Sequence, residues 1–214
     1  MNQKITRKFL VLVAAASLGF AASARAVQGA TAPDAPATSL GLLGQTYAGM
    51  DYSRINLNNS PVNADRYSFE YNQPLNHGFD AVFNYDWTQS GFFATDRAHE
   101  QSLATALRAF SLSQAWGKPY VEAGLGYDWT RFAGARDHSF AWIGGAGVEF
   151  QAAPALTVTP FVRYIRTNGY ADKNTADYGV KANYWLTRQW ALNGAVSRND
   201  RQDMTYKLGV NVSF

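Results

Sequence analysis

The sequence contains no cysteine, so an exported chain of this kind cannot use disulfides to stabilise its fold. Only three histidines are present, and no metal-ligand spacing joins His77, His99 and His138. After residue 26 there is no apolar run of about 18 residues, so that part of the chain offers no transmembrane helix. The fold must therefore rest on side-chain packing and hydrogen bonds, and we expect no metal and no cofactor.

The first 26 residues have the organisation of a secretory signal peptide. A basic start at residues 4–8 precedes the apolar run 9–22, and the segment ends in the small-residue sequence Ala24-Arg25-Ala26. The apolar run is shorter than the roughly 20 residues that a spanning helix needs. We therefore expect residues 1–26 to be a signal peptide that is cleaved after Ala26.

The net charge of the whole chain gives a misleading impression of its partners. It is +3, from 19 basic and 16 acidic residues, but four of the basic residues and none of the acidic ones lie in the signal segment. Cleavage leaves 15 basic and 16 acidic residues, a net charge of −1. A chain with no excess of lysine and arginine has little with which to neutralise phosphates, so we predict no nucleic-acid partner.

The rest of the chain divides into a lead-in and a region of short alternating segments. Residues 27–44 are rich in alanine, proline, threonine and glycine, and we expect a flexible periplasmic lead-in there. Over residues 45–214, apolar and polar residues alternate in segments separated by turn-rich stretches, which is typical of β-strands. We predict ten strands, with an eight-strand barrel as the alternative. They run approximately over 46–55, 66–72, 79–87, 102–112, 119–131, 139–150, 156–166, 177–186, 190–198 and 204–214.

The last segment shows the alternation most clearly, because Met204, Tyr206 and Leu208 alternate with Thr205 and Lys207. The predicted connections alternate as well, with the longer ones after odd-numbered segments and the shorter ones after even-numbered segments. Transmembrane barrels have long loops outside the cell and short turns in the periplasm. The connection lengths therefore predict that both ends of the barrel region lie in the periplasm.

Aromatic residues lie at both ends of the predicted apolar faces. The outer set comprises Tyr52, Tyr67, Tyr85, Trp87, Tyr127, Trp129, Phe140, Trp142, Tyr164, Tyr178 and Tyr206, and the periplasmic set Tyr71, Phe79, Phe150, Trp190 and Phe214. Two rings suit the two headgroup layers of a membrane, whereas a soluble core concentrates its largest rings in the middle. We predict an all-β fold, a transmembrane antiparallel up-and-down β-barrel in the bacterial outer membrane. Within it, Pro160 removes a ladder donor and predicts a local irregularity in the seventh strand.

The signal segment, the short strands, the aromatic rings and the terminal Phe214 resemble the small outer-membrane barrels of the opacity-protein and porin-like superfamily. The resemblance covers about residues 45–214 and consists of patterns, without a diagnostic motif. It implies that Phe214, with Val212 and Val210 spaced behind it, is part of the signal read by the barrel-assembly machinery. Members include adhesins, small pores and structural proteins, so the resemblance implies a location more than one function.

If the apolar faces meet lipid, the opposite faces line the lumen. They carry the charged residues Asp51, Glu70, Asp80, Asp86, Arg108, Glu122, Asp128, Glu149, Arg163, Lys181 and Lys207. Buried charges must be paired or hydrated. We expect a salt-bridged, hydrogen-bonded plug in a barrel too narrow for a wide channel. The alternative is a narrow, cation-preferring water path lined by the acidic excess.

The predicted outer loops hold the candidates for binding. Phe92 and Phe93 lie at the tip of the longest predicted loop. An exposed aromatic pair can anchor a partner protein or a glycan, or it can fold back on the rim. Because loops vary freely on a rigid barrel, we expect the function to reside in them.

Enzymatic activity has weaker support. Asp137-His138 and His99-Glu100 are adjacent pairs that resemble acid–base groups of outer-membrane proteases, but those proteases have taller barrels and longer loops. His138-Ser139 does not form a nucleophile and base for a lipid-A-modifying enzyme, because neighbouring strand residues point to opposite faces. We expect no enzyme and no catalytic residues.

The sequence therefore predicts a monomeric barrel with a structural or surface-interaction, adhesin-like role through its extracellular loops. A porin-like channel is the second hypothesis, and an outer-membrane protease or lipid-A-modifying enzyme is a distant third. The expected partners are outer-membrane lipids and lipopolysaccharide, the barrel-assembly machinery during biogenesis, and a host or surface ligand.

Overall fold

The computed structural model describes residues 41–58, 60, 62–92, 96–111, 117–132, 135–168 and 173–214. Among these residues, no helix is long and apolar enough to cross a membrane. The predicted signal peptide, its cleavage site after Ala26 and the lead-in as far as residue 40 lie outside the described residues.

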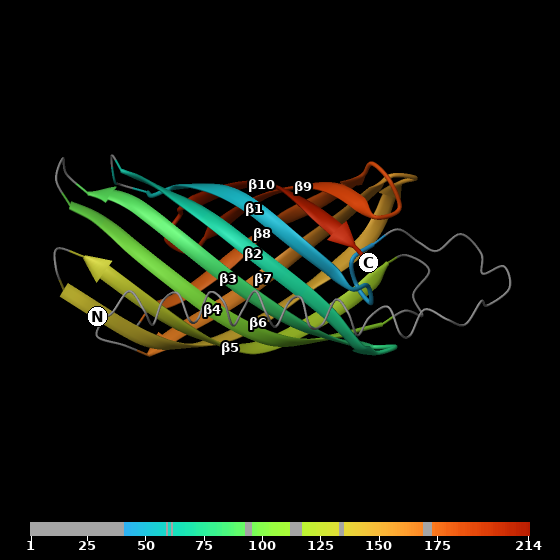
Figure 1. Cartoon of the computed structure of the whole chain (residues 1–214), viewed down its shortest axis with the longest axis horizontal. Coiled ribbons are helices and arrows are strands. Elements are labelled where there is room, and N and C mark those ends of the chain that lie inside the picture. Colours follow the sequence, from blue (N-terminus) through green and yellow to red (C-terminus); the bar gives the residue numbers. More distant parts are fainter. Residues whose placement is uncertain are drawn as a thin grey trace, which may run out of the picture. The chain divides into compact units, whose positions relative to one another are not determined.

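Ten antiparallel strands close into one barrel, in which each strand pairs with its neighbours in the chain and the first pairs with the last (Figure 1). The strands are β1 (Tyr47–Asn56), β2 (Asn63–Asn76), β3 (Phe79–Phe92), β4 (Asp96–Phe110), β5 (Lys118–Phe132), β6 (Ala135–Ala153), β7 (Leu156–Asn168), β8 (Lys173–Trp185), β9 (Trp190–Asn199) and β10 (Met204–Ser213). Each predicted segment corresponds to one of them. The ten-strand prediction is therefore confirmed, and the eight-strand alternative is wrong.

The two ends of the barrel differ in what they hold. The first residue of β1 and the last of β10 lie at the same end, where the backbone N–H of Phe214 donates to the carbonyl of Thr46 at 3.0 Å. We call this the terminal end and the other the hairpin end. The longest predicted loop at the hairpin end is largely strand instead, since β3 continues to Phe92 and β4 already begins at Asp96. Both strands occupy most of the predicted loop 88–101, which is a correction to the sequence analysis.

Register assigns each side chain to the inside or the outside of the wall. On the outside, Met50, Val121 and Leu208 expose 69%, 59% and 71% of their surface. On the inside, Asn72 and Asp80 are fully buried although both are polar. A soluble barrel has the reverse arrangement, whereas apolar side chains turned outward suit a lipid environment.

Rings from adjacent strands meet on the outer face towards the hairpin end. Tyr67 stands between Tyr52 on β1 and Trp87 on β3, with ring centroids 5.5 Å apart in both pairs. On β5, Tyr127 and Trp129 make an edge contact at 4.8 Å. These rings belong to the outer aromatic set that the sequence predicts.

The irregularity expected at Pro160 also occurs. The ladder between β6 and β7 pairs Gly147 with Phe161 and resumes at Phe150 with Val158, so it is interrupted beside Pro160. Proline has no backbone N–H and so cannot donate a ladder hydrogen bond, which accounts for a gap in the ladder at this position.

Candidate functional site

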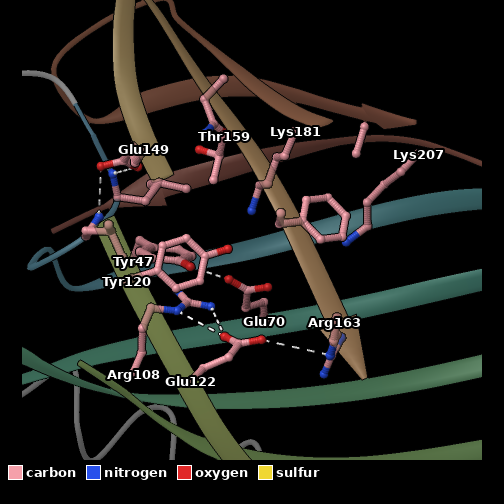
Figure 2. Close-up of a pocket in the computed structure, with 15 residues that line it drawn as sticks. Tyr47, Glu70, Arg108, Tyr120, Glu122, Glu149, Thr159, Arg163, Lys181 and Lys207 are labelled. Carbon is pink, nitrogen blue, oxygen red and sulfur yellow. Dashed lines mark hydrogen bonds and ion pairs between the residues drawn. The ribbon is translucent and has the colours of Figure 1, made fainter. Parts of the chain in front are cut away.

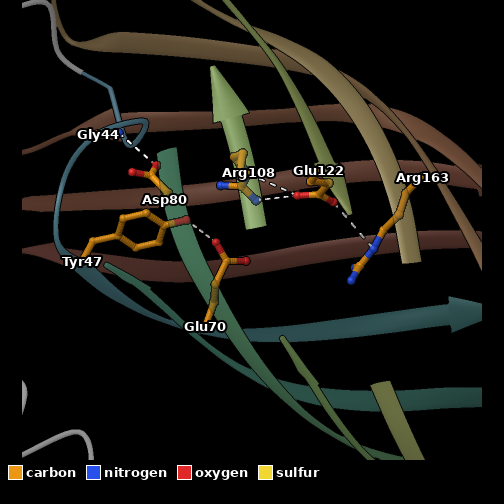
Figure 3. Close-up of polar contacts among 7 residues, drawn as sticks. All are labelled: Gly44, Tyr47, Glu70, Asp80, Arg108, Glu122 and Arg163. Carbon is orange, nitrogen blue, oxygen red and sulfur yellow. Dashed lines mark hydrogen bonds and ion pairs between the residues drawn. The ribbon is translucent and has the colours of Figure 1, made fainter. Parts of the chain in front are cut away.

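Residues 41–46, which we call the cap segment, lie across the terminal end of the lumen. The backbone N–H of Leu42 donates to Glu149 Oε2 at 2.8 Å, and that of Leu43 to Oε1 at 3.4 Å. The N–H of Gly44 donates to Asp80 Oδ2 at 3.0 Å (Figure 3). Leu42 and Leu43 are both buried. The last four residues of the predicted flexible lead-in 27–44 are thus packed against the barrel.

The strand order shows that the cap segment crosses the lumen. It continues directly into β1, whereas Glu149 lies on β6, which is five strands from β1 in either direction around the barrel. Strands five apart in a ten-strand barrel stand on opposite walls. A segment that starts β1 and binds β6 therefore spans the opening.

A turn within the cap segment gives it this course. The N–H of Gln45 donates to the carbonyl of Leu42 at 3.1 Å, and Gly44, the third residue of the turn, has a φ of 78°. A type II turn requires positive φ at that position, which glycine adopts without strain. The amide of Asn72 then donates to the carbonyl of Gln45 at 2.8 Å and fixes the end of the turn to β2.

Two groups of buried side chains lie towards the terminal end of the lumen. The first is an apolar cluster of Leu42, Tyr47, Trp185 and Ala191, all buried. The second is an amide chain across β7 to β10. In it Asn193 donates to Asn211 at 3.2 Å, Asn211 to Asn183 at 2.9 Å, and Asn183 to Thr157 at 3.4 Å. Hydrogen bonds between buried amides satisfy polar groups that would otherwise be costly in the interior. Among the described residues, Asn193 Oδ1 is buried without such a partner.

A charged network lies inside the lumen (Figures 2 and 3). Arg108 on β4 donates twice to Glu122 Oε2 on β5, at 3.1 and 2.9 Å. The other carboxylate oxygen of Glu122 lies 3.9 Å from Nε of Arg163 on β7. The guanidinium of Arg108 also stands over the ring of Tyr120 at 5.0 Å.

Further pairs join the network to the wall and to the cap segment. The hydroxyl of Tyr47 donates to Glu70 on β2. Lys207 on β10 lies 2.6 Å from Asp51 on β1, and this pair spans the seam where the barrel closes. Lys118 lies 3.9 Å from Glu149, the carboxylate that also holds the cap segment.

A cavity of about 150 Å³ lies inside the described part of the barrel. It is lined by cap residues Leu42 and Leu43 at one end and by side chains of both charges, among them Glu70, Lys181 and Lys207 (Figure 2). A cavity of this size and polarity has room for a few waters, not for a wide channel.

The structure places all eleven charged residues predicted for the lumen at inward-facing positions. Seven of them line the cavity: Glu70, Arg108, Glu122, Glu149, Arg163, Lys181 and Lys207. Asp51 pairs with Lys207, and Asp80 binds the cap segment. Asp86 and Asp128 lie nearer the hairpin end, where both stand opposite Ser102, one on each side.

Sequence reasoning missed several residues of this site. Lys118 lies one residue before the predicted strand 119–131, and Tyr47 and Tyr120 were not considered because they are uncharged. Both tyrosines occupy positions in the alternation that face the same side as the predicted lumen charges, and this pattern could have identified them. The cap segment gave only a weak signal, a leucine pair followed by glycine.

The three histidines do not converge. His99 stacks on Trp87 at 6.2 Å and His138 on Tyr127 at 6.1 Å, both on the outer face. Asp137 accepts from the backbone N–H of His138 at 2.8 Å, so this pair is joined through the backbone. Across the described ranges, no group of three or more histidine, cysteine or acidic side chains could hold a metal ion. Phe93 and the side chain of Phe92 lie outside the described part of the chain.

No protein-family model matches the sequence, and no curated protein matches it. Among solved structures, the β domain of the Bordetella autotransporter BrkA is similar at 12% identity over 79% of this chain and 99% of that chain, with a TM-score of 0.51. The translocator domain of autotransporter NalP from Neisseria meningitidis matches 97% of this chain and 98% of that chain at 10% identity and a TM-score of 0.49. Neisserial surface protein A matches 79% and 96% at 14% identity and a TM-score of 0.43.

At such low identity, the match to the BrkA β domain concerns the fold alone. The fold is that of an outer-membrane β-barrel, antiparallel and closed.

Proposed function

We propose that this chain is a bacterial outer-membrane protein whose lumen is closed, and that it has a structural or surface-interaction role at its hairpin end. The apolar outer face with its aromatic rings supports a position in a membrane. In that position the terminal end faces the periplasm and the hairpin end faces outward. Membership of the opacity-protein and porin-like superfamily stays a prediction.

The observation that carries this proposal is the cap segment. Three consecutive backbone N–H groups, of Leu42, Leu43 and Gly44, bind carboxylates on two strands of the wall. Beneath the cap segment, the amide chain and the ion pairs of Glu122 occupy part of the lumen, and the cavity that Leu42 and Leu43 help to line is small. A lumen filled in this way has no evident path for solutes, which favours a role outside the lumen.

If the lumen is closed, a partner is expected to contact the hairpin end. We propose that its connections bind a host or surface ligand, with Phe92 and Phe93 as the candidate contacts from the sequence. We further propose that the protein is monomeric, has no enzymatic activity and is assembled by the barrel-assembly machinery.

A narrow, cation-preferring channel is the second candidate. Asp86 and Asp128 favour it, because both are acidic, face inward and, among the described residues, form no ion pair. The cap segment opposes it, since a conducting path would have to pass the terminal end.

Planar-bilayer conductance of the full-chain protein, purified from outer membranes, tests the proposal. We expect no steady current from the folded protein at two salt concentrations. The double variant Leu42→Asp/Leu43→Asp places two acids beside Glu149 and in an apolar cluster, so it should expel the cap segment and give stepwise conductance.

Leu75→Asp is the matched control, because this leucine is exposed at the same end of the barrel. It should leave the protein silent. Steady cation-selective steps from the unaltered protein would support the channel instead.

A further inference from the structure

Three basic side chains form a row on the outer face of the wall near the hairpin end. In the register, Arg131 on β5 is directly opposite Arg136 on β6, and on its other side it is directly opposite His99 on β4. We call these three residues the basic row. Both arginines are exposed, and the neighbouring outward pair on the same strands is Trp129 and His138.

The basic row lacks an acidic partner in the part of the chain that is described. Directly opposed like charges destabilise an antiparallel pair. No salt bridge is formed by either arginine there. The nearest acids in the register, Asp137 and Glu100, are both paired with Thr130 and so face inward.

Arg54 shows how the same surface treats an arginine that is neutralised. It too faces outward near the hairpin end, but Asp65 on the adjacent strand lies 3.1 Å away. The hydroxyl of Tyr52 donates to the same carboxylate at 2.7 Å. The basic row differs from Arg54 in having no acidic partner among the described residues, so its guanidinium groups are free to bind an anion from outside the described barrel.

The place of the basic row identifies the kind of anion. Arg131 follows Tyr127 and Trp129 on the outward face, and Arg136 precedes Phe140 and Trp142 on it. Aromatic rings of this kind sit at the headgroup level of a membrane. A residue two positions further along a strand lies about 7 Å beyond these rings, or less along the membrane normal when the strand is tilted. That distance places the arginines at the depth of the lipid phosphates.

We propose that the basic row binds the phosphate of an outer-leaflet glycolipid, with lipid A as the probe that represents it. This rests on the proposed outer-membrane location. Two guanidinium groups on adjacent strands can each donate a pair of hydrogen bonds to phosphate oxygens. A phosphate between them removes the repulsion of the opposed arginines, while Trp129 and Phe140 contact the apolar part of the lipid.

The test is lipid binding to the full-chain protein purified from outer membranes and stripped of lipid in detergent. Native mass spectrometry would measure the fraction of folded barrel that carries phosphorylated lipid A, dephosphorylated lipid A or inorganic phosphate. We expect tight binding of the phosphorylated lipid only. The double variant Arg131→Gln/Arg136→Gln should bind it at least about tenfold more weakly.

Arg54→Gln is the matched control and should bind phosphorylated lipid A as the unaltered protein does. Equal binding by the double variant would overturn the proposal, and so would equal binding of the dephosphorylated lipid. Binding of inorganic phosphate alone with the same loss in the double variant would indicate a free-anion site and overturn the lipid assignment. Each variant is scored on protein that migrates as a folded, heat-modifiable barrel, so a failed lipid site stays distinct from a failed barrel.

Discussion

The carboxylate of Glu122 accepts two hydrogen bonds from Arg108 and lies 3.9 Å from Arg163, so one acid compensates two cations. Both partners in the closer pair are largely buried, with side-chain exposures of 13% and 11%. Removing one charge from such a pair leaves the other uncompensated in a poorly solvated interior. At the scale of single residues, Glu122 is therefore the most sensitive position in the lumen.

Glu122→Gln should lower the free energy of unfolding by about 3 to 5 kcal/mol, because it strands Arg108 in the lumen. Urea unfolding of the barrel in detergent, followed by loss of the heat-modifiable band, measures this. Asp65→Asn is the matched control, since its pair with Arg54 is solvent-exposed and should contribute almost nothing. Equal midpoints for the two variants would contradict the role given to Glu122.

Gly44→Ala should destabilise the barrel by about 1 to 2 kcal/mol, because the positive φ of this turn residue is unfavourable for any residue with a Cβ. The added methyl would also lie only 3.2 Å from the ring of Phe110. Gly144→Ala is the comparison, since a Cβ there meets nothing within 4 Å. In the same urea series, the unfolding midpoint of Gly44→Ala should be lower than that of the unaltered protein, and the midpoint of Gly144→Ala should be unchanged. The reverse order would refute the turn assignment.

At the scale of elements, the strands at the centre of the wall were predictable and their outer extensions were not. The alternation in β10 fixed its span almost to the residue, because one of its faces is apolar and the other polar. Towards the hairpin end of β3 and β4 this contrast disappears. The sequence pattern therefore predicted a loop over residues 88–92 and 96–101, which are strand in the structure. Strands that continue beyond the apolar belt have water on both sides, so no period of two is required of them.

The candidate site was predictable to the same extent. Parity alone placed eleven charges on the inward face, since every residue of a strand belongs to one of two faces. It could not pair Lys207 with Asp51 or bring Glu122 between two arginines, because these contacts depend on which strands meet and how far each side chain reaches. The cap segment was missed because backbone N–H groups, which every residue but proline carries, make its contacts.

The terminal strand makes its own prediction. Phe214→Ala should reduce the amount of assembled barrel. In the outer-membrane barrels that this sequence resembles, the final aromatic residue is part of the signal that the barrel-assembly machinery recognises, and Phe214 is at that position. The measurement is heat-modifiable protein in the outer-membrane fraction. Val196→Ala, which also shortens an exposed outward side chain, should have little effect. Undiminished assembly of the Phe214 variant would refute this reading.

At the scale of the whole molecule, the main feature is that the two faces of the barrel wall differ in polarity. Outside are large apolar side chains and aromatic rings, and inside are amides and ion pairs that hold the cap segment. An outer face of this kind suits a lipid environment. We propose that the hairpin end is the surface that meets the exterior. The central proposal is a closed barrel that spans the outer membrane with its terminal end in the periplasm.

Because the chain has no cysteine, single introduced thiols report position without interference. Arg201 is exposed between β9 and β10 at the hairpin end, and Arg188 is exposed between β8 and β9 at the terminal end. The most direct measurement is labelling of Arg201→Cys and Arg188→Cys in intact cells with a membrane-impermeant maleimide. We predict that Arg201→Cys is labelled at once and Arg188→Cys only after the outer membrane is permeabilised. Labelling of both in intact cells, of neither before permeabilisation, or in the opposite order would contradict the account.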